Sequence, residues 1–130
     1  MDSEAVPVFG ERLPDQEYQP RPSAYVVVRD SQQRVAVVQV RRGAFLPGGG
    51  IEPGETPEEA AAREAREECG LEVDILSSIG FAEEYLYSER EATFFAKHSS
   101  FFRGSVRGSV PSAEPDHELA WVHQDEAERL

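Results

Sequence analysis

Three closely spaced glutamates are the residues of this sequence best suited to chemistry. Glu64, Glu67 and Glu68 stand three and four positions apart. On an α-helix, which advances about 100° per residue, their side chains would share roughly a third of the circumference. Such carboxylates repel one another unless a cation neutralises them. Glutamates grouped on a helix usually form a solvated face, so the spacing alone leaves two readings open: that face, or a site for a hard divalent metal ion.

The glutamates lie within a longer motif of fixed spacing. It runs through nine specified positions, which are Gly49, Glu55, Arg63, Glu64, Ala65, Glu67, Glu68, Gly70 and Leu71. The pattern resembles the signature of the Nudix hydrolases, G-x5-E-x7-R-E-U-x-E-E-x-G-U, where U is a bulky aliphatic residue. Ala65 is the single departure, because the family usually has Ile, Leu or Val there. We interpret it as a packing variation that leaves the metal ligands untouched.

The resemblance implies a fold, a reaction and a cofactor. The fold is α/β, a Nudix-type α/β/α sandwich with a mixed β-sheet and the motif helix packed on it. The reaction is hydrolysis of a phosphoanhydride bond in a nucleoside diphosphate-linked compound by attack of water on phosphorus, with Mg²⁺ or Mn²⁺ as the cofactor. Glu67 and Glu68 would bind the metal most directly, and Glu64 would be a further ligand or the general base. The backbone carbonyl of Gly48 or Gly49 would add an oxygen ligand.

Arg63 and Glu55 are expected to support these ligands. Arg63 precedes Glu67 by four residues, which is within ion-pair reach on one face of a helix. Such a pair would hold the carboxylate in the orientation that a metal requires. Glu55 is expected to steady its loop or to pair with Arg63.

Acidic residues also gather far from the motif, at Glu114, Asp116 and Glu118. Enzymes of the resembled family often add an acidic residue from a distant loop as a metal ligand or base. We therefore consider Glu118 a catalytic candidate and Glu114 a residue near the substrate or the metal. A solvated loop explains any one of these side chains more often than catalysis does.

Other residues bear on the substrate. Arg41 and Arg42 precede the glycine-rich turn, where MutT enzymes carry a similar pair, and either a phosphate contact or a surface role fits them. In the resembled family, a proline about 15 positions past the motif suggests ADP-ribose, but Leu86 stands there. A tyrosine about 16 positions past it suggests dinucleoside polyphosphates, and Tyr87 matches. The aromatic surfaces available to a base are Tyr87, Tyr85 and Phe94-Phe95, and stacking on one of these rings would give a loose base preference.

The substrate subclass expected is therefore a dinucleoside polyphosphate or a (d)NTP. ADP-ribose, a nucleotide sugar, and a catalytically silent nucleotide-binding module are the alternatives. The three histidines, His98, His117 and His123, have no metal-ligand spacing, and we assign them no chemistry.

Composition limits the class of protein. A chain of 130 residues with a net charge of −12 forms one domain and lacks the basic footprint that binds duplex nucleic acid. No apolar stretch approaches the roughly 20 residues of a membrane span, and residues 1–10 do not resemble a signal peptide. The one cysteine, Cys69, is expected to be a buried thiol. We expect a cytoplasmic monomer or homodimer with a small-molecule nucleotide substrate.

The pattern of residues also predicts the elements that position these side chains. Residues 1–22 are rich in proline and predict an extended arm before a domain at 23–130. Strands are predicted at 24–28, at 34–40 as its hairpin partner, and at 71–79, 80–87, 100–106 and 119–122. The motif helix is predicted over 57–69, capped by Thr56 and Gly70, with Ala61, Ala62, Ala65 and Cys69 against a sheet. Residues 88–97 are ambiguous, and a last helix is predicted from residue 124.

Overall fold

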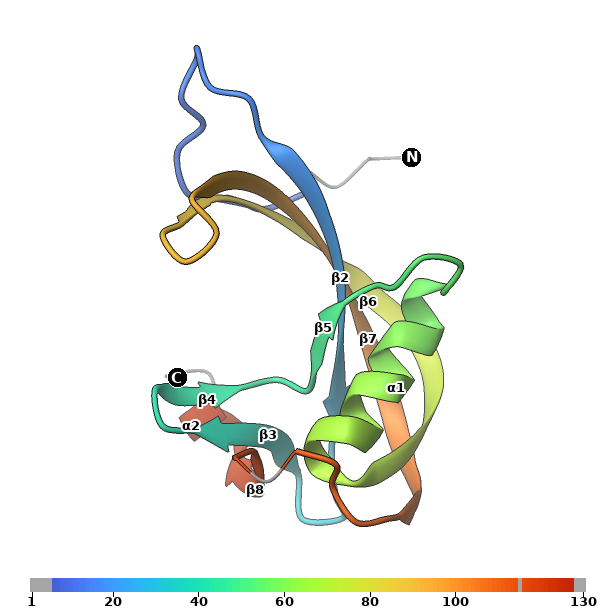
Figure 1. The fold of residues 1–130 in the computed structure, drawn as a ribbon. Coiled ribbons are helices and arrows are strands. Elements are labelled where there is room, and N and C mark those ends of the chain that lie inside the picture. The colour runs from blue at the N-terminus through green and yellow to red at the C-terminus, as the bar shows by residue number, and fades with distance from the viewer. Residues whose placement is uncertain (1–5, 115, 128–130) are drawn as a thin grey trace.

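A mixed five-stranded sheet forms the larger part of the structure, a computed structural model that describes residues 6–114 and 116–127 (Figure 1). Its strands, in the order in which they lie side by side, are β1 (Val8–Phe9), β6 (Leu71–Ser88), β7 (Thr93–Ser109), β2 (Gln19–Val28) and β5 (Gly48–Gly50). The β1–β6 and β2–β7 pairs are parallel, whereas β6–β7 and β2–β5 are antiparallel. The predicted mixed sheet is confirmed.

A second, three-stranded antiparallel sheet has the order β4-β3-β8. Its strands are β3 (Arg34–Val40), β4 (Gly43–Phe45) and β8 (Glu118–His123). The predicted pairing of β3 with β2 in a hairpin is wrong, because the two strands belong to different sheets and the only bridge near them joins Arg29, just after β2, to Val35. The reason is that β5 and β7 already occupy both edges of β2, so β3 has no free edge there and pairs elsewhere.

The motif helix, α1, spans Pro57–Cys69 as predicted. The Thr56 hydroxyl accepts a hydrogen bond from the Glu59 amide at 3.1 Å, and the Glu59 carboxylate accepts one from the Thr56 amide at 2.9 Å. This capping box satisfies amides that a helix N-terminus leaves unpaired. The helix ends at Gly70, which adopts a left-handed conformation with φ of 68°.

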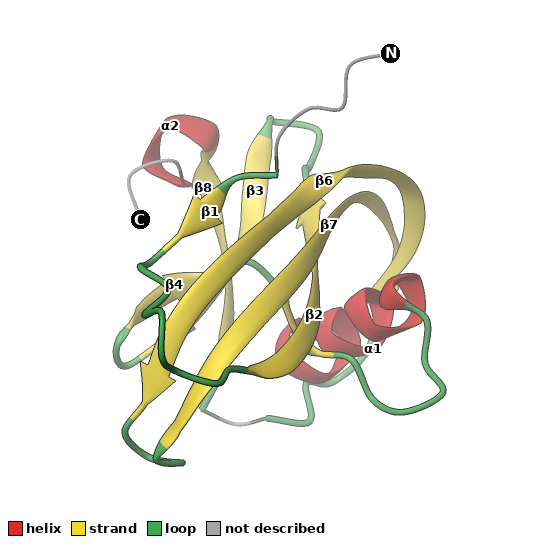
Figure 2. Cartoon of the chain, turned by 90° about the horizontal axis from the view of Figure 1, so that it is seen from above, coloured by secondary structure: helices red, strands yellow, loops and turns green. Residues whose placement is uncertain are grey.

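Small side chains join α1 to the sheet. Ala60, Ala61, Ala65 and Cys69 are buried, and Ala62 is partly buried against the same core. They belong to one core with Val26 and Val28 of β2 and with residues of β3, β6 and β7. Figure 2 shows α1 lying across one face of the large sheet. This arrangement confirms the predicted α/β sandwich and the buried thiol.

Two strands are longer than predicted. The separate strands expected at 71–79 and 80–87 form the single strand β6, whose register against β7 shifts at three places. Of the ambiguous residues 88–97, Ser88 ends β6, residues 89–92 form a turn, and Thr93 begins β7, which includes the predicted strand at 100–106. The strand expected at 119–122 is confirmed as β8. A short helix α2 (Gln124–Ala127) follows, and residues 128–130 lie outside the described residues.

The predicted N-terminal arm takes part in the large sheet. Val8 and Phe9 pair with β6, and β2 begins at Gln19, five residues before the predicted strand. Between them, the Tyr18 ring packs on Tyr85 and Phe94 with centroid distances of 5.1 and 5.6 Å. The boundary between an arm and a domain at residue 22 stays a prediction. Within the described residues, no helix has the length and apolar character needed to cross a membrane.

Candidate active site

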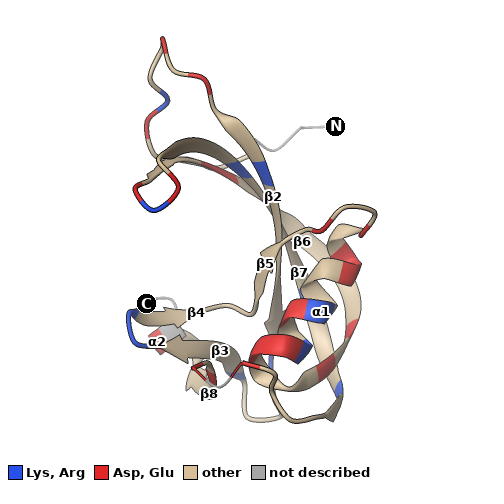
Figure 3. Ribbon diagram, in the orientation of Figure 1, with Lys and Arg blue, Asp and Glu red and all other residues tan. Residues whose placement is uncertain are grey.

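The three motif glutamates share a helix face, and a loop after β7 brings a fourth carboxylate to them. Carboxylate oxygens of Glu64, Glu67 and Glu114 lie within 4.8 Å of one another. Ser112 holds this loop on the C-terminal end of α1, because its hydroxyl donates to the backbone carbonyl of Glu67 at 2.9 Å. Figure 3 shows acidic residues along the ribbon of α1. These acidic residues form a cluster that could bind a metal ion.

The glycine-rich strand β5 forms the second wall of this cluster. The Gly48 amide donates to the carboxylate of Glu68 at 2.9 Å. A Cβ atom on Gly49 would collide with the carboxylate of Glu64, so only glycine lets Glu64 lie directly against the strand. Because β5 has no side chains at these positions, the carboxylates of Glu64 and Glu68 can lie between α1 and β5.

Arg63 connects the loop before α1 to the glutamates. Its guanidinium donates to both carboxylate oxygens of Glu55, at 2.7 and 3.1 Å, and to the carbonyl of Gly50 at 3.0 Å. Its remaining nitrogen donates to Glu67 at 3.0 Å and lies 3.3 Å from Glu64. A forked guanidinium can hold several oxygens at fixed positions at once. The structure therefore brings Glu55 and Arg63 together behind the helix face, where Arg63 orients Glu67.

The carboxylates of the site differ in charge balance. Hydrogen bonds from Arg63 hold the pKa of Glu55 below its usual range. Burial raises the pKa of Glu64 to about 7, and the neighbouring Glu68 adds to the shift. Burial also raises the pKa of Glu68 to about 7, despite the hydrogen bond from Gly48 and with a further contribution from Glu114. Arg63 thus balances the negative charge of Glu55, whereas Glu64 and Glu68 lack enough nearby positive charge to offset their burial.

His117 joins the site although its sequence spacing gave no sign of it. One of its nitrogens lies within 4.8 Å of carboxylate oxygens of Glu68 and Glu114. Its Nδ1 atom lies 2.5 Å from the Glu114 carboxylate, so the histidine contacts the acidic cluster directly. The carboxylate oxygens gathered here are the kind of ligand that suits Mg²⁺ or Mn²⁺. The residues present therefore fit such an ion. The position of His117 beside these glutamates follows from the fold of the loop between β7 and β8 and could not be predicted from the sequence.

The structure separates Glu118 from this cluster. Glu118 begins β8 and, with Asp116, lines an open groove of about 620 Å³. Arg41 and Arg42, at the turn between β3 and β4, line the same groove. Neither arginine forms an ion pair within the described part of the chain. Among the acidic loop residues it is thus Glu114 that lies beside the motif glutamates, whereas Glu118 lies beside the arginines.

Tyr87 lies apart from both the carboxylate cluster and the groove lined by Arg41 and Arg42. It pairs in register with Phe94 next to the turn that joins β6 to β7, and the two rings are 4.6 Å apart. This turn is remote from α1 in Figure 1. The structure does not bring Tyr87 to the carboxylates.

Solved structures share this fold. The MutT protein from Methanosarcina mazei Go1 has a TM-score of 0.70 at 22% sequence identity, covering 89% of this chain and 86% of that one. A NUDIX hydrolase from Nitrosomonas europaea has a TM-score of 0.65 at 23% identity, covering 85% of this chain and 77% of that one. At these identities, the likeness establishes the fold.

Sequence comparison identifies the family. A Bacillus subtilis (strain 168) protein named as a proposed 8-oxo-dGTP diphosphatase is 31% identical over 103 residues, which are 76% of this chain and 64% of that protein. The match therefore spans less than two thirds of that relative. The family model for the NUDIX domain matches residues 19–130, which include α1, β5 and the loop that carries Glu114. The chain belongs to the NUDIX domain family.

Proposed function

We propose that this protein hydrolyses a phosphoanhydride bond in nucleoside diphosphate-linked compounds and requires Mg²⁺ or Mn²⁺. The observation that carries the proposal is the carboxylate cluster of Glu64, Glu67 and Glu114, next to which Glu68 and His117 lie. Membership of the NUDIX domain family supports it. Glu64, Glu67 and Glu68 would hold the ion, and the Gly48 carbonyl is a further candidate ligand.

Each residue of the site has a proposed role in the reaction. A bound divalent cation supplies charge neutralisation at phosphate oxygens and lowers the pKa of water. Glu64, if it is not itself a ligand, accepts the proton of the attacking water, because it lies beside the carboxylates that would hold the ion. Arg63 fixes the carboxylate of Glu67, and Glu55 fixes Arg63. Glu114 takes the distal acidic role that the sequence suggested for Glu118.

The substrate proposed is a (d)NTP or a dinucleoside polyphosphate. Arg41 and Arg42 support an anionic ligand, because their guanidinium groups line a groove and have no ion-pair partner in the described chain. The Bacillus subtilis relative, named for an 8-oxo-dGTP activity, favours the (d)NTP subclass. Leu86, in place of the proline of the ADP-ribose subclass, argues against that alternative. The cytoplasmic location and a monomeric or homodimeric state stay predictions.

Phosphate release from a panel of nucleotides tests the proposal. We expect no turnover with a chelator, and recovery with Mg²⁺ or Mn²⁺. Glu67→Gln and Glu68→Gln should each lower kcat by about a hundredfold or more, because a ligand is lost without a change of shape. Glu58→Gln is the matched control, since Glu58 is exposed in the first turn of the same helix. Near-normal turnover in both site variants would contradict the assignment.

Binding measurements separate the enzyme from a silent nucleotide-binding module. An enzyme releases phosphate or a nucleoside monophosphate in proportion to time and protein. A silent module would bind a nucleotide in the presence of the metal and release no product at any concentration. The panel should include ADP-ribose and sugar nucleotides, so that the alternative substrates are tested at equal concentration.

A further inference from the structure

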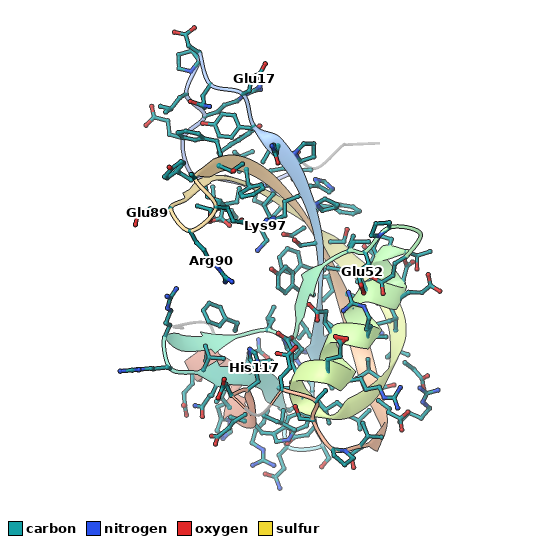
Figure 4. The ribbon with its side chains drawn as sticks, in the orientation of Figure 1. Glu17, Glu52, Glu89, Arg90, Lys97 and His117 are labelled. Atoms are coloured by element: carbon teal, nitrogen blue, oxygen red, sulfur yellow. The ribbon has the colours of Figure 1, made fainter. Side chains whose placement is uncertain are left out.

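His117 is a nitrogen donor beside a site whose other candidate ligands offer oxygen. It forms a group of possible metal ligands with Glu68 and Glu114, in which one donor atom of each residue lies within 4.8 Å of the other two. The second such group, Glu64, Glu67 and Glu114, consists of carboxylates alone. Figure 4 shows His117 between the C-terminal turn of α1 and the small sheet. The two groups meet at Glu114, so they offer adjacent positions that differ in donor chemistry.

Backbone hydrogen bonds fix the loop that carries Glu114 and His117. The Ala113 amide donates to the carbonyl of Glu67 at 3.1 Å, near the end of α1. A helix leaves its last carbonyls without partners inside the helix, so this bond satisfies helix and loop together. The His117 amide donates to the Glu114 carbonyl at 3.1 Å, which closes a turn that sets the two side chains next to each other. The loop is thus held by contacts that do not depend on an ion.

The carboxylates of Glu68 and Glu114 lack a strongly basic partner. Arg63 forms ion pairs with Glu64 at 3.3 Å and with Glu67 at 3.0 Å. Among the described residues, no lysine or arginine lies within ion-pair distance of Glu68 or Glu114. Two carboxylates so close repel each other, and a bound cation removes that repulsion. Positive charge on this side of the cluster would therefore come from an ion.

The imidazole and the two carboxylates are close enough to hold one ion. Bonds of about 2.1 Å place opposite ligands of an ion about 4.2 Å apart. Donor atoms within 4.8 Å of one another therefore reach a common ion by small side-chain rotations. The side chains of His117 and Glu114 are 29% and 37% exposed, so an ion can enter from solvent. Glu68 is fixed from the other side, because its carboxylate accepts a hydrogen bond from the Gly48 amide.

The kind of donor decides which ions this position favours. Mg²⁺ prefers oxygen ligands and usually keeps several of its waters. Imidazole suits the first-row transition ions, whose affinity for a given site rises from Mn²⁺ through Fe²⁺ to Co²⁺. An imidazole nitrogen from His117 in place of a water therefore strengthens the binding of these ions and adds little to the binding of Mg²⁺.

We propose that His117, Glu68 and Glu114 bind a first-row transition ion such as Mn²⁺ or Co²⁺ in preference to Mg²⁺, with an imidazole nitrogen as a ligand. This position adjoins the carboxylates of Glu64 and Glu67, so a phosphate that reaches them would lie near the ion. The inference rests on the proposed function because it concerns the metal of the same site, yet metal binding is measured without a substrate.

A histidine that only held Glu114 in place would behave differently. The Nδ1 atom lies 2.5 Å from the Glu114 carboxylate, so an imidazole in that role would orient this carboxylate without touching the ion. Its removal would weaken the binding of Mg²⁺ and Mn²⁺ to a similar degree, because both ions use the carboxylate. A nitrogen ligand, in contrast, matters mainly to the transition ion and is visible in its spectrum.

Pulsed electron paramagnetic resonance of Mn²⁺ bound to the full chain, made without a histidine tag, provides the test. The spectrum should show coupling of Mn²⁺ to a ligand nitrogen, and labelling histidine with the heavy nitrogen isotope should change that coupling. His117→Gln should remove it. His98→Gln is the matched control, since His98 also lies near a glutamate, 3.5 Å from Glu83, but belongs to neither group of possible ligands among the described residues.

Calorimetric titration of the same proteins measures the preference between ions. His117→Gln should raise Kd for Mn²⁺ and Co²⁺ by about tenfold or more, because even the loss of a residue that supports a ligand costs about 10–100-fold in affinity. The Kd for Mg²⁺ should change by less than about twofold, since this ion gains little from nitrogen.

The outcomes separate this inference from the proposed function. Mn²⁺ bound without nitrogen coupling, coupling that persists in His117→Gln, or equal losses for Mg²⁺ and Mn²⁺ would overturn the inference and leave the proposed function intact. Coupling that depends on His117 in a protein that hydrolyses no nucleotide would uphold the inference and overturn the proposed function. A protein that binds none of these ions would overturn both.

Discussion

Replacing Ala65 by phenylalanine should damage both the stability and the site of this protein. Ala65 has no exposed surface and lies in the layer where α1 meets the sheet. An added ring has no space there, and overpacking of this kind costs about 1–3 kcal/mol. An unfolding entropy of about 2.1 cal/mol/K per residue gives about 0.27 kcal/mol/K for the 130 residues. The expected fall in Tm is therefore about 4–11 °C.

The same change should lower activity, because the helix carries the glutamates. Pushing α1 away from the sheet would lengthen the contact of 2.9 Å between the Gly48 amide and Glu68. A displacement of about 1 Å in an active site can cost up to about a hundredfold in rate.

Thermal melting by circular dichroism and turnover under saturating Mg²⁺ measure the two effects. Arg66→Phe is the control, since it places the same residue type at the next, exposed position of the helix. An unchanged Tm in Ala65→Phe, or an equal fall in both variants, would refute close packing of this face.

Three further outcomes follow from the site. Arg63→Lys keeps the charge but loses the fork, so kcat should fall about 10–100-fold while the circular dichroism spectrum is retained. Glu114→Gln should lower kcat far more than Glu118→Gln, and parallel kinetics of the two variants would show whether the distal acid lies in the metal cluster or in the groove. Arg41→Ala should raise KM more than it lowers kcat if the arginine contacts the ground state and the transition state alike. A loss confined to kcat would assign Arg41 to the transition state alone.

Local signals predicted α1 well because they act within a few residues. Thr56, Pro57 and Glu59 begin the helix through hydrogen bonds and a fixed backbone angle, and Gly70 ends it. The spacing of the alanines and the glutamates then assigned one face to the sheet and one to the site. Each of these features depends on contacts between residues near one another in the sequence, so no knowledge of the rest of the chain was needed.

The errors concern contacts between distant segments. The strand at 34–40 was recognised, but its partner depends on which edges of β2 are free, and β5 and β7 occupy them. Glu114 and Glu118 have similar sequence contexts, so the sequence did not show which one would reach the motif. The hydroxyl of Ser112, bonded to the end of α1, decides between them.

The distribution of charge in the fold explains how so acidic a chain can attract a polyphosphate. Arg63 is surrounded by glutamates and so offers no free charge to a substrate. Arg41 and Arg42 lack carboxylate partners within the described structure, and they lie on a segment outside the acidic helix face. With the metal site on α1, they would place positive charge at separate points along one bound nucleotide. Binding should therefore require the metal for the phosphates and the unpaired cations for the remainder, so that neither alone overcomes a net charge of −12.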